Sequence, residues 1–183
     1  MPKLIKNGRV VADDWQLVSL AEGEAAADAA VPAGRALIPL AVWQARRGEL
    51  AARVARDELG VWLDAGEGPE DIADDLAHFA VIAVNFPKFT DGRGYSTAAL
   101  LRTRYGYSGE LRAIGEVLRD QFNYMTRSGF DALQPRAGRY TDAQLEAAVA
   151  SITDFTEPYQ ASATHPQPLF RRVPRSPQAQ VKP

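Results

Sequence analysis

AVIAVNFPKFTDGRGYS, residues 80–96, is the stretch that decides the fold of this chain. Its first part, residues 80–86, is an almost uninterrupted apolar run, which is typical of a strand buried on both faces of a parallel sheet. A loop with two glycines follows, and a helix is expected over residues 95–105. This order predicts one strand–loop–helix unit.

Similar units lie on both sides of it. Strands are expected at 36–42, 60–63, 110–117 and 130–133, and helices at 44–56, 68–79, 118–128 and 141–152. Alternating strands and helices of this length predict an α/β fold with a mainly parallel sheet. Right-handed crossovers leave either an open, doubly wound sheet or a partial barrel. Closure is not encoded in any local pattern, and we prefer the open sheet by a narrow margin.

The two ends of the chain differ from this central region. Asn7-Gly8 separates two short apolar stretches and predicts a tight β-hairpin within residues 1–20, because this pair tolerates positive φ. Residues 35–155 form the expected α/β domain. Six of the twelve prolines lie between Pro158 and Pro183, so we expect residues 156–183 to be a disordered tail.

Composition excludes several classes of function. The chain has no cysteine, which excludes disulfides, thiolate catalysis and cysteine-ligated metal clusters. Its two histidines, His78 and His165, are far apart, so no metal site is expected. A net charge of −2 gives no reason to expect nucleic acid or a membrane as a partner. No segment has the length of a signal peptide or membrane span, so we expect a cytoplasmic protein.

Charge is distributed unevenly along the chain. Residues 88–127 contain seven basic and four acidic residues, so this window carries +3 while the remainder carries −5. The window begins where the central strand ends, and ligands of α/β proteins bind beyond the carboxyl ends of the strands. Excess positive charge in this place predicts a site for a small anion or an anionic substrate.

The loop of residues 88–94 is the centre of that predicted site. Glycines let an anion approach the backbone, and the amino terminus of the following helix supplies free N–H groups. An arginine adds a two-pronged contact to an oxyanion. The predicted anion-binding residues are Lys88, Gly92, Arg93, Gly94 and Arg112. The residues identify no catalytic group with certainty, but Asp91, Glu116 and Asp120 are the acid/base candidates if this is an enzyme.

A second interpretation of the same residues needs no ligand. Gly-Arg-Gly is a weak pattern that matches neither the dinucleotide nor the P-loop fingerprint. Arginines on amphipathic helices usually face water or pair with nearby carboxylates. Arg119, with Asp120 and Glu116 beside it, fits a solvated cluster of this kind.

The central region also resembles a known family. The resemblance is carried by NFPKFTDGRGYS (85–96), LLR (100–102), RYGY (104–107), GELRA (109–113), LRDQ (118–121) and GFDA (129–132). These motifs are similar to those of a bacterial family of uncharacterised proteins, domain-of-unknown-function family 934, often labelled "oxidoreductase probably involved in sulfite reduction". The resemblance covers most of residues 1–155.

The resemblance implies a role in sulfite or sulfate assimilation but no mechanism. Because the chain lacks cysteine, it cannot hold an iron–sulfur cluster through thiolates or relay electrons through thiols. It also lacks a dinucleotide fingerprint, and the residues identify no cofactor. The implied role is therefore that of an accessory protein whose partners are sulfite reductase or its electron donor, with sulfite or sulfate as a small oxyanion ligand.

Three hypotheses follow. The first is an accessory protein of sulfite reduction with an anion-binding loop at residues 88–94. The second is an enzyme that acts on a small anionic substrate at the same loop. The third is a structural interaction module whose basic segment is only a solvated surface.

Overall fold

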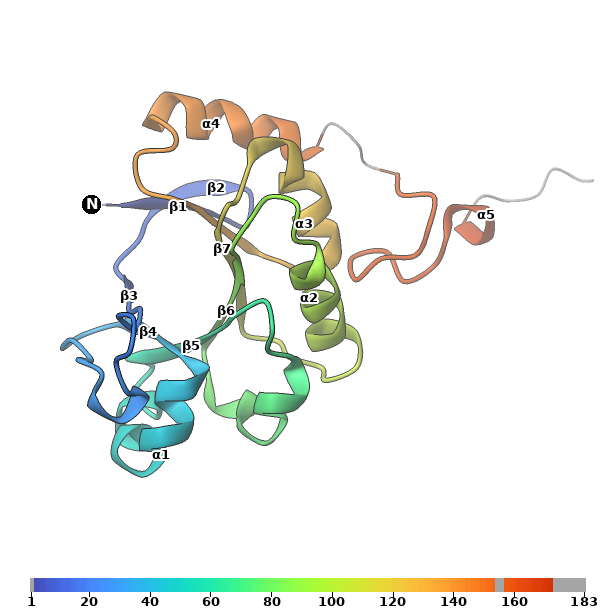
Figure 1. Cartoon of the computed structure of the whole chain (residues 1–183). Helices are drawn as coiled ribbons and strands as arrows, with labels where there is room; N and C mark the ends of the chain where they lie inside the picture. The colour runs from blue at the N-terminus through green and yellow to red at the C-terminus, as the bar shows by residue number, and fades with distance from the viewer. Residues whose placement is uncertain (1, 154–156, 173–183) are drawn as a thin grey trace, which may run out of the picture.

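The computed structural model describes residues 2–153 and 157–172, which form one mixed α/β structure around an eight-stranded sheet. The strand order is β2-β1-β8-β7-β6-β5-β4-β3 (Figure 1). The strands are β1 (Lys3–Lys6), β2 (Arg9–Ala12), β3 (Gln16–Leu17), β4 (Ala36–Pro39), β5 (Leu59–Leu63), β6 (Val81–Phe86), β7 (Glu110–Gly115) and β8 (Ala132–Pro135).

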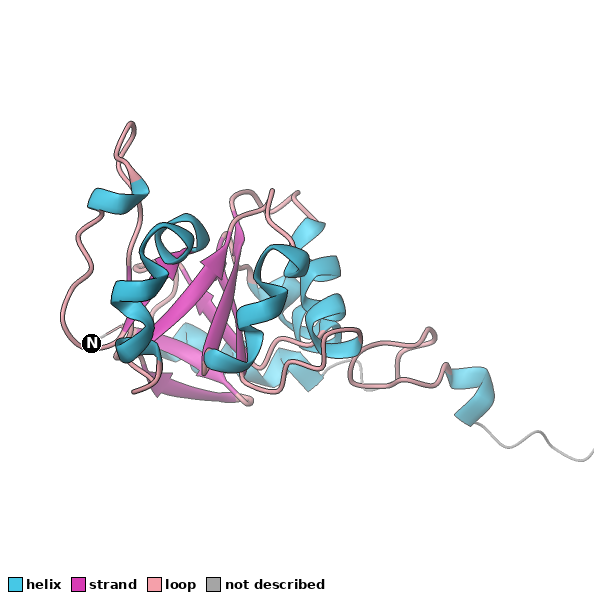
Figure 2. Ribbon diagram, turned by 90° about the horizontal axis from the view of Figure 1, so that it is seen from below, coloured by secondary structure: helices cyan, strands magenta, loops and turns pink. Residues whose placement is uncertain are grey.

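Strands β3 to β8 run parallel and follow one another in sequence order, whereas β1 is antiparallel to both β2 and β8. When crossovers of one hand always step in one direction, all the helices fall on one face. Figures 1 and 2 show the result, a curled sheet with the helices on its outside. The helices are α1 (Leu40–Val54), α2 (Arg93–Thr103), α3 (Phe122–Ser128), α4 (Asp142–Ala150) and α5 (Leu169–Arg172), with 3₁₀ segments η1 (Ala26–Asp28), η2 (Pro69–His78), η3 (Arg119–Gln121) and η4 (Ser151–Thr153).

The predicted fold class is therefore confirmed, as a half-barrel. The sheet is open, as preferred, with β2 and β3 at its two edges, but it is not doubly wound, because the strand order never reverses. Strand β4 ends at Pro39, earlier than predicted, since α1 already begins at Leu40. The predicted helix over residues 68–79 is a ten-residue 3₁₀ segment, and the two-residue strand β3 was not predicted.

The predicted hairpin is present, with φ of 49° at Asn7 and 70° at Gly8. Its strands belong to the same sheet as the rest of the α/β region. In the tail, residues 157–172 contain turns and the single-turn helix α5, and the Ala163 amide donates to the Arg127 carbonyl at 3.2 Å. The remainder of the predicted tail, residue 156 and residues 173–183, lies outside the described residues.

A polar network lies on the concave face of the sheet. Arg112 on β7 is 1% exposed, and its register neighbour on β6 is Ala83, which belongs to a small apolar cluster there. The Arg112 guanidinium donates to Glu110 at 2.7 Å, to Asp13 at 3.0 Å and to Gln134 on β8 at 3.1 Å. Because a buried guanidinium is tolerated only when it is paired, this contact set fixes how the segments around it are placed.

Asp13 belongs to the short link that joins β2 to β3, the two outer strands of the sheet. Figure 1 shows this link crossing the open side of the curl. The Asp13 side chain is 0% exposed, and its Oδ1 accepts from Arg112 and from the Trp15 amide at 3.2 Å. The Arg112–Asp13 ion pair therefore ties the link between the two edge strands, β2 and β3, to β7 on the other side of the curl.

Replacing Arg112 with alanine is expected to destabilise the protein by about 3–5 kcal/mol, because Asp13 would be left buried without its positive partner and Glu110 would keep only Lys6. Urea unfolding measures this change. The matched control is Arg9→Ala on the exposed start of β2, for which the expected change is within about 0.5 kcal/mol. A loss below about 1 kcal/mol for Arg112→Ala would show that the network does not organise the curl.

Candidate functional site

The loop of residues 88–94 is closed on itself by an ion pair. Arg93 donates to Asp91 from Nε at 3.0 Å and from its terminal nitrogen at 2.7 Å, and the Arg93 amide donates to the same carboxylate at 3.2 Å. Asp91 therefore occupies the amino terminus of α2, where an external anion was predicted. These hydrogen bonds lower the pKa of Asp91 to about 2.

The two glycines of the loop have different roles. Neither has positive φ. A side chain on Gly94 would bring its Cβ to 2.7 Å from the Phe86 ring, whereas nothing obstructs one on Gly92 beyond Tyr95 at 3.9 Å. Gly94 is therefore explained by close packing of α2 on β6, and it is buried rather than open to a ligand.

Arg112 does not join Lys88 and Arg93. Its guanidinium is occupied by the internal acceptors described above, and the side chain is 2% exposed. The prediction placed it near the loop because it lies on the strand that follows the loop in the sequence. In the structure it lies on the concave face, so it is not available to the predicted anion.

The three acid/base candidates also separate. Asp91 is paired with Arg93, and Glu116 is paired with Arg136 at 2.9 Å. Asp120 has no ion pair among the described residues and lines an open cleft. Glu116 and Asp120 thus follow the same strand but face different neighbours.

The structure does bring three loops together at the carboxyl edge of the sheet. The Gln121 side chain donates to the Phe89 carbonyl at 3.0 Å, and the Arg119 amide donates to the Tyr140 hydroxyl at 2.9 Å. We call residues 88–92, 116–121 and 136–140 the basic rim. Within the described part of the chain, three of its basic side chains, Lys88, Arg119 and Arg139, have no carboxylate partner.

Arg139 and Tyr140 were missed by the sequence analysis, and Arg119 was assigned only to a solvated cluster. The available signal was the segment Arg136–Tyr140 directly after β8, the third consecutive loop at the same edge. It was overlooked because the window of excess positive charge ended at Arg127. Arg102, in contrast, has a structural role. Its guanidinium donates to the Asp131 carboxylate and to the backbone carbonyls of residues 107, 109 and 129.

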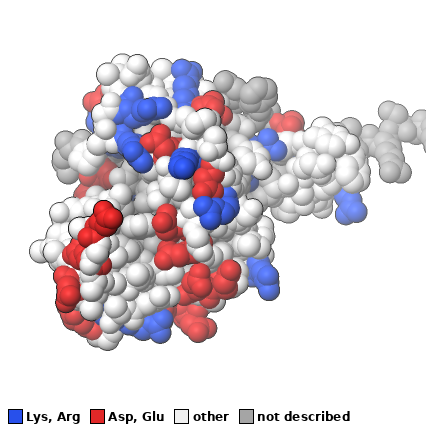
Figure 3. Space-filling view, viewed as in Figure 1, with Lys and Arg blue, Asp and Glu red and all other residues white. Residues whose placement is uncertain are grey.

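Arg119 and Arg139 line one cleft of about 660 Å³, which we call the arginine cleft. Its other lining residues are Leu118, Asp120, Asn123, Tyr124, Tyr140 and Ser151. Ser151 donates to the Ala148 carbonyl at 2.6 Å and lies 3.4 Å from the Arg119 Nε. In Figure 3, Lys and Arg gather mainly in the upper part of the view, where α3 and α4 lie in Figure 1, and Asp and Glu dominate the lower part.

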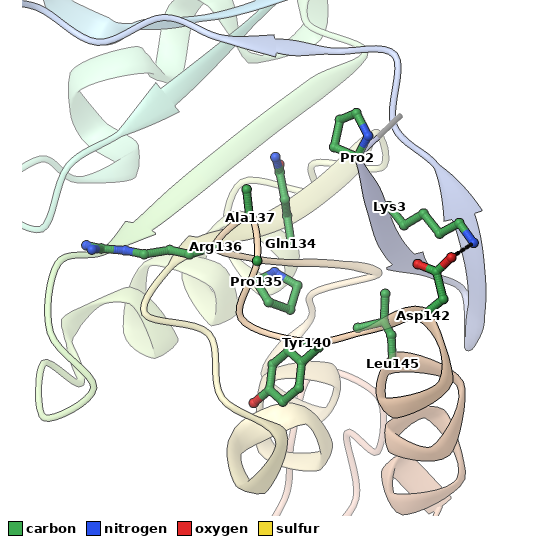
Figure 4. A pocket seen from close by; sticks show the side chains of 10 residues that line it. Pro2, Lys3, Gln134, Pro135, Arg136, Ala137, Tyr140, Asp142 and Leu145 are labelled. Carbon is green, nitrogen blue, oxygen red and sulfur yellow. Dashed lines mark hydrogen bonds and ion pairs between the residues drawn. The ribbon is translucent and has the colours of Figure 1, made fainter.

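A second hollow, of about 230 Å³, lies between β1, β8 and the start of α4. Figure 4 shows that its polar groups do not converge on the space between them. Lys3 and Asp142 neutralise each other at 2.7 Å, and the Arg136 and Tyr140 side chains point away from one another (Figure 4). This hollow therefore lacks a directed binding group, and the arginine cleft is the better candidate.

Aromatic side chains border the arginine cleft on the α2–α3 side. Tyr124 is 53% exposed and packs edge-on against Tyr95 with ring centroids 4.8 Å apart. Burial, with a contribution from the charge of Asp120, raises the pKa of Tyr95. Phe89, on the neighbouring loop, is 61% exposed. Large exposed aromatic residues beside basic ones are typical of protein interfaces.

Residues 2–153 and 157–172 contain no group of three His, Asp or Glu side chains placed to hold a metal ion. None of the helices in that part of the chain is long and apolar enough to cross a membrane. One hydroxyl–imidazole hydrogen bond joins the chain neighbours Thr164 and His165, at 3.0 Å, in an exposed part of the tail.

The comparisons with known proteins give one result. A family model described as "Bacterial protein of unknown function (DUF934)" matches residues 60–170, which include all of β5 except Leu59, strands β6 to β8 and the whole basic rim. No curated protein matches the chain.

The Asp91–Arg93 pair predicts a measurable titration. The Asp91 carboxyl should titrate near pH 2, and Arg93→Gln should return its pKa towards the ordinary value of about 3.9. Because the folded pKa is lowered, the stabilising contribution is present above the unfolded pKa and is lost as pH falls through the folded pKa. Side-chain carboxyl NMR measures both midpoints, and an unchanged midpoint in Arg93→Gln would contradict the assignment.

Proposed function

We propose, from the premise that this chain belongs to the bacterial DUF934 family, that it is an accessory protein of assimilatory sulfite reduction that works by binding another protein. The sulfur role is what the family resemblance implies. The contact role is supported by the basic rim and its exposed aromatic residues. The partner we propose is sulfite reductase or its electron donor.

The surface around Tyr124 is the observation that carries this proposal. Tyr124 and Phe89 are 53% and 61% exposed to solvent. Aromatic residues provide most of the binding free energy in many interfaces, because they bury a large area with little loss of rotamer freedom. Arg127 lies over the Tyr124 ring at 6.0 Å and adds a positive group on the α3 side.

Charge identifies the kind of partner. Lys88 and Arg119 lie on adjacent loops of the rim without a carboxylate partner among the described residues. The protein as a whole carries −2, so this positive region stands out against an acidic background. A partner surface with carboxylates around an apolar centre complements it, and charge of this kind increases the rate and specificity of association.

The enzyme hypothesis has less support. Asp91 and Glu116 are held in ion pairs, which leaves Asp120 as the only one of the three candidates that is free of them within the described structure. A binding function uses the same rim without requiring an acid/base group.

Tyr124→Ala and Lys88→Glu are expected to weaken binding to purified sulfite reductase or its electron donor, each by about tenfold or more. Tyr124→Ala removes aromatic surface that the partner would cover, and Lys88→Glu places a negative charge opposite the acidic surface of the partner. Biolayer interferometry with each purified partner measures the change. Phe170→Ala and Arg9→Glu are matched controls, since Phe170 is 54% exposed on α5 and Arg9 is exposed on the hairpin.

Two results would contradict this proposal. The first is the absence of saturable binding of the unaltered protein to either partner. The second is equal loss of affinity in the control variants, which would indicate a non-specific charge effect. Deletion of the gene should also impair growth on sulfate as sole sulfur source, and wild-type growth of that strain would remove the pathway assignment.

A further inference from the structure

We infer that the arginine cleft is a binding site for the phosphate or sulfate group of a small molecule, with Arg119 and Arg139 as the anion ligands. This site differs from the loop of residues 88–94, where Asp91 already occupies the helix terminus. The inference goes beyond the proposed function and does not depend on it, because the ligand is a small molecule and not a protein.

The two arginines come from separate loops and are placed by the fold. Arg119 begins η3, immediately after the turn that follows β7, and Arg139 lies in the loop between β8 and α4. The hydrogen bond from the Arg119 amide to the Tyr140 hydroxyl, at 2.9 Å, joins these loops. Tyr140 packs in turn on the buried Phe122 ring, with centroids 6.3 Å apart, so the junction is anchored in the core.

The charge of the cleft is not neutralised from within. Neither guanidinium has a carboxylate partner in the described part of the chain, and Asp120 is the one acidic residue among those that line the cleft. Asp120 also contributes to the raised pKa of Tyr95 on α2. Two guanidinium groups against one carboxylate leave a net positive cleft.

Hydrogen-bonding capacity favours an oxyanion over other anions. Guanidinium groups present paired N–H donors in one plane, which match two oxygens of a phosphate or sulfate. The Tyr140 hydroxyl accepts from Arg119, so its own hydrogen is free for donation to a third oxygen. Two guanidinium groups and one hydroxyl in a single cleft supply enough donors for a group with three outward oxygens.

The size of the cleft bears on what carries that group. A volume of about 660 Å³ is within the range of about 300–1,000 Å³ found for small-molecule sites, and is larger than an inorganic ion needs. Tyr124 and Leu118 add apolar wall next to the arginines. The shared chemistry is a terminal phosphate or sulfate, carried either by the free ion or by an ester with an apolar body.

Isothermal titration calorimetry at low ionic strength tests the site, with inorganic phosphate, inorganic sulfate and phenyl phosphate as separate probes and chloride, which has no oxygen acceptors, as the anion control. We expect saturable binding of the three oxyanion probes, and tighter binding of phenyl phosphate if an ester is the ligand. Arg139→Gln and Arg119→Gln should each weaken binding about tenfold or more, since each removes a charged hydrogen-bonding partner.

Matched variants separate the site from general charge and from misfolding. Arg139→Lys keeps the charge but loses the paired donors, so its affinity should fall between those of the unaltered protein and Arg139→Gln. Tyr140→Phe should weaken binding by removing the hydroxyl, and Arg9→Gln should leave it unchanged. Thermal unfolding of each variant verifies that the fold is retained.

Equal binding of chloride, or equal affinity of Arg139→Gln and the unaltered protein, would overturn the inference. Absence of saturable binding of all three probes at millimolar concentration would do the same. Failure of this experiment leaves the partner-binding proposal intact, because that proposal is measured with a protein ligand and through Lys88 and Tyr124. Failure of the partner experiment likewise does not affect these titrations.

Discussion

A single buried guanidinium organises the centre of this protein. Arg112 lies on the concave face of the sheet at 1% exposure, where an unpaired positive charge would be too costly to retain. Its partners come from β7 itself, from β8 and from the link between β2 and β3. Lys6 on β1 adds a second contact to Glu110, at 2.6 Å, so the network contains two positive and two negative groups. Charge pairing, rather than apolar packing alone, therefore sets how the sheet curls.

The order of the strands determines where a ligand can be bound. Because β3 to β8 follow one another without reversal, the helices cover the outer face and the concave face is filled by side chains such as Arg112. The loops beyond the carboxyl ends of the strands are then the natural place for recognition, as in other α/β proteins. Three of these loops meet through the contacts of Gln121 and Tyr140, and together they present basic and aromatic side chains.

Local patterns were sufficient for much of the fold and insufficient for the site. The apolar run of β6, the Asn7-Gly8 turn and the start of the last predicted helix near residue 141 each depend on neighbouring residues, and each was predicted correctly. The role of Arg112 depends on Asp13, 99 positions earlier, and no local pattern reports such a contact. The reverse holds for Arg93, whose partner is two residues away and could have been recognised from the sequence. Arg139 was missed because its proposed role depends on lining the same cleft as Arg119, and the two residues belong to different loops.

The short link between β2 and β3 has a consequence for how the structure opens. The margins of the sheet are joined by covalent chain and by Asp13, not by a ladder of backbone hydrogen bonds, and β3 pairs with β4 over only two residues. A barrel closed by a full ladder opens only when many bonds break together. Here the seam can separate locally while the central strands stay paired, so transient breathing of the interior is confined to one side of the molecule. Opening of this seam would expose the buried ion network without breaking the ladders from β4 to β8.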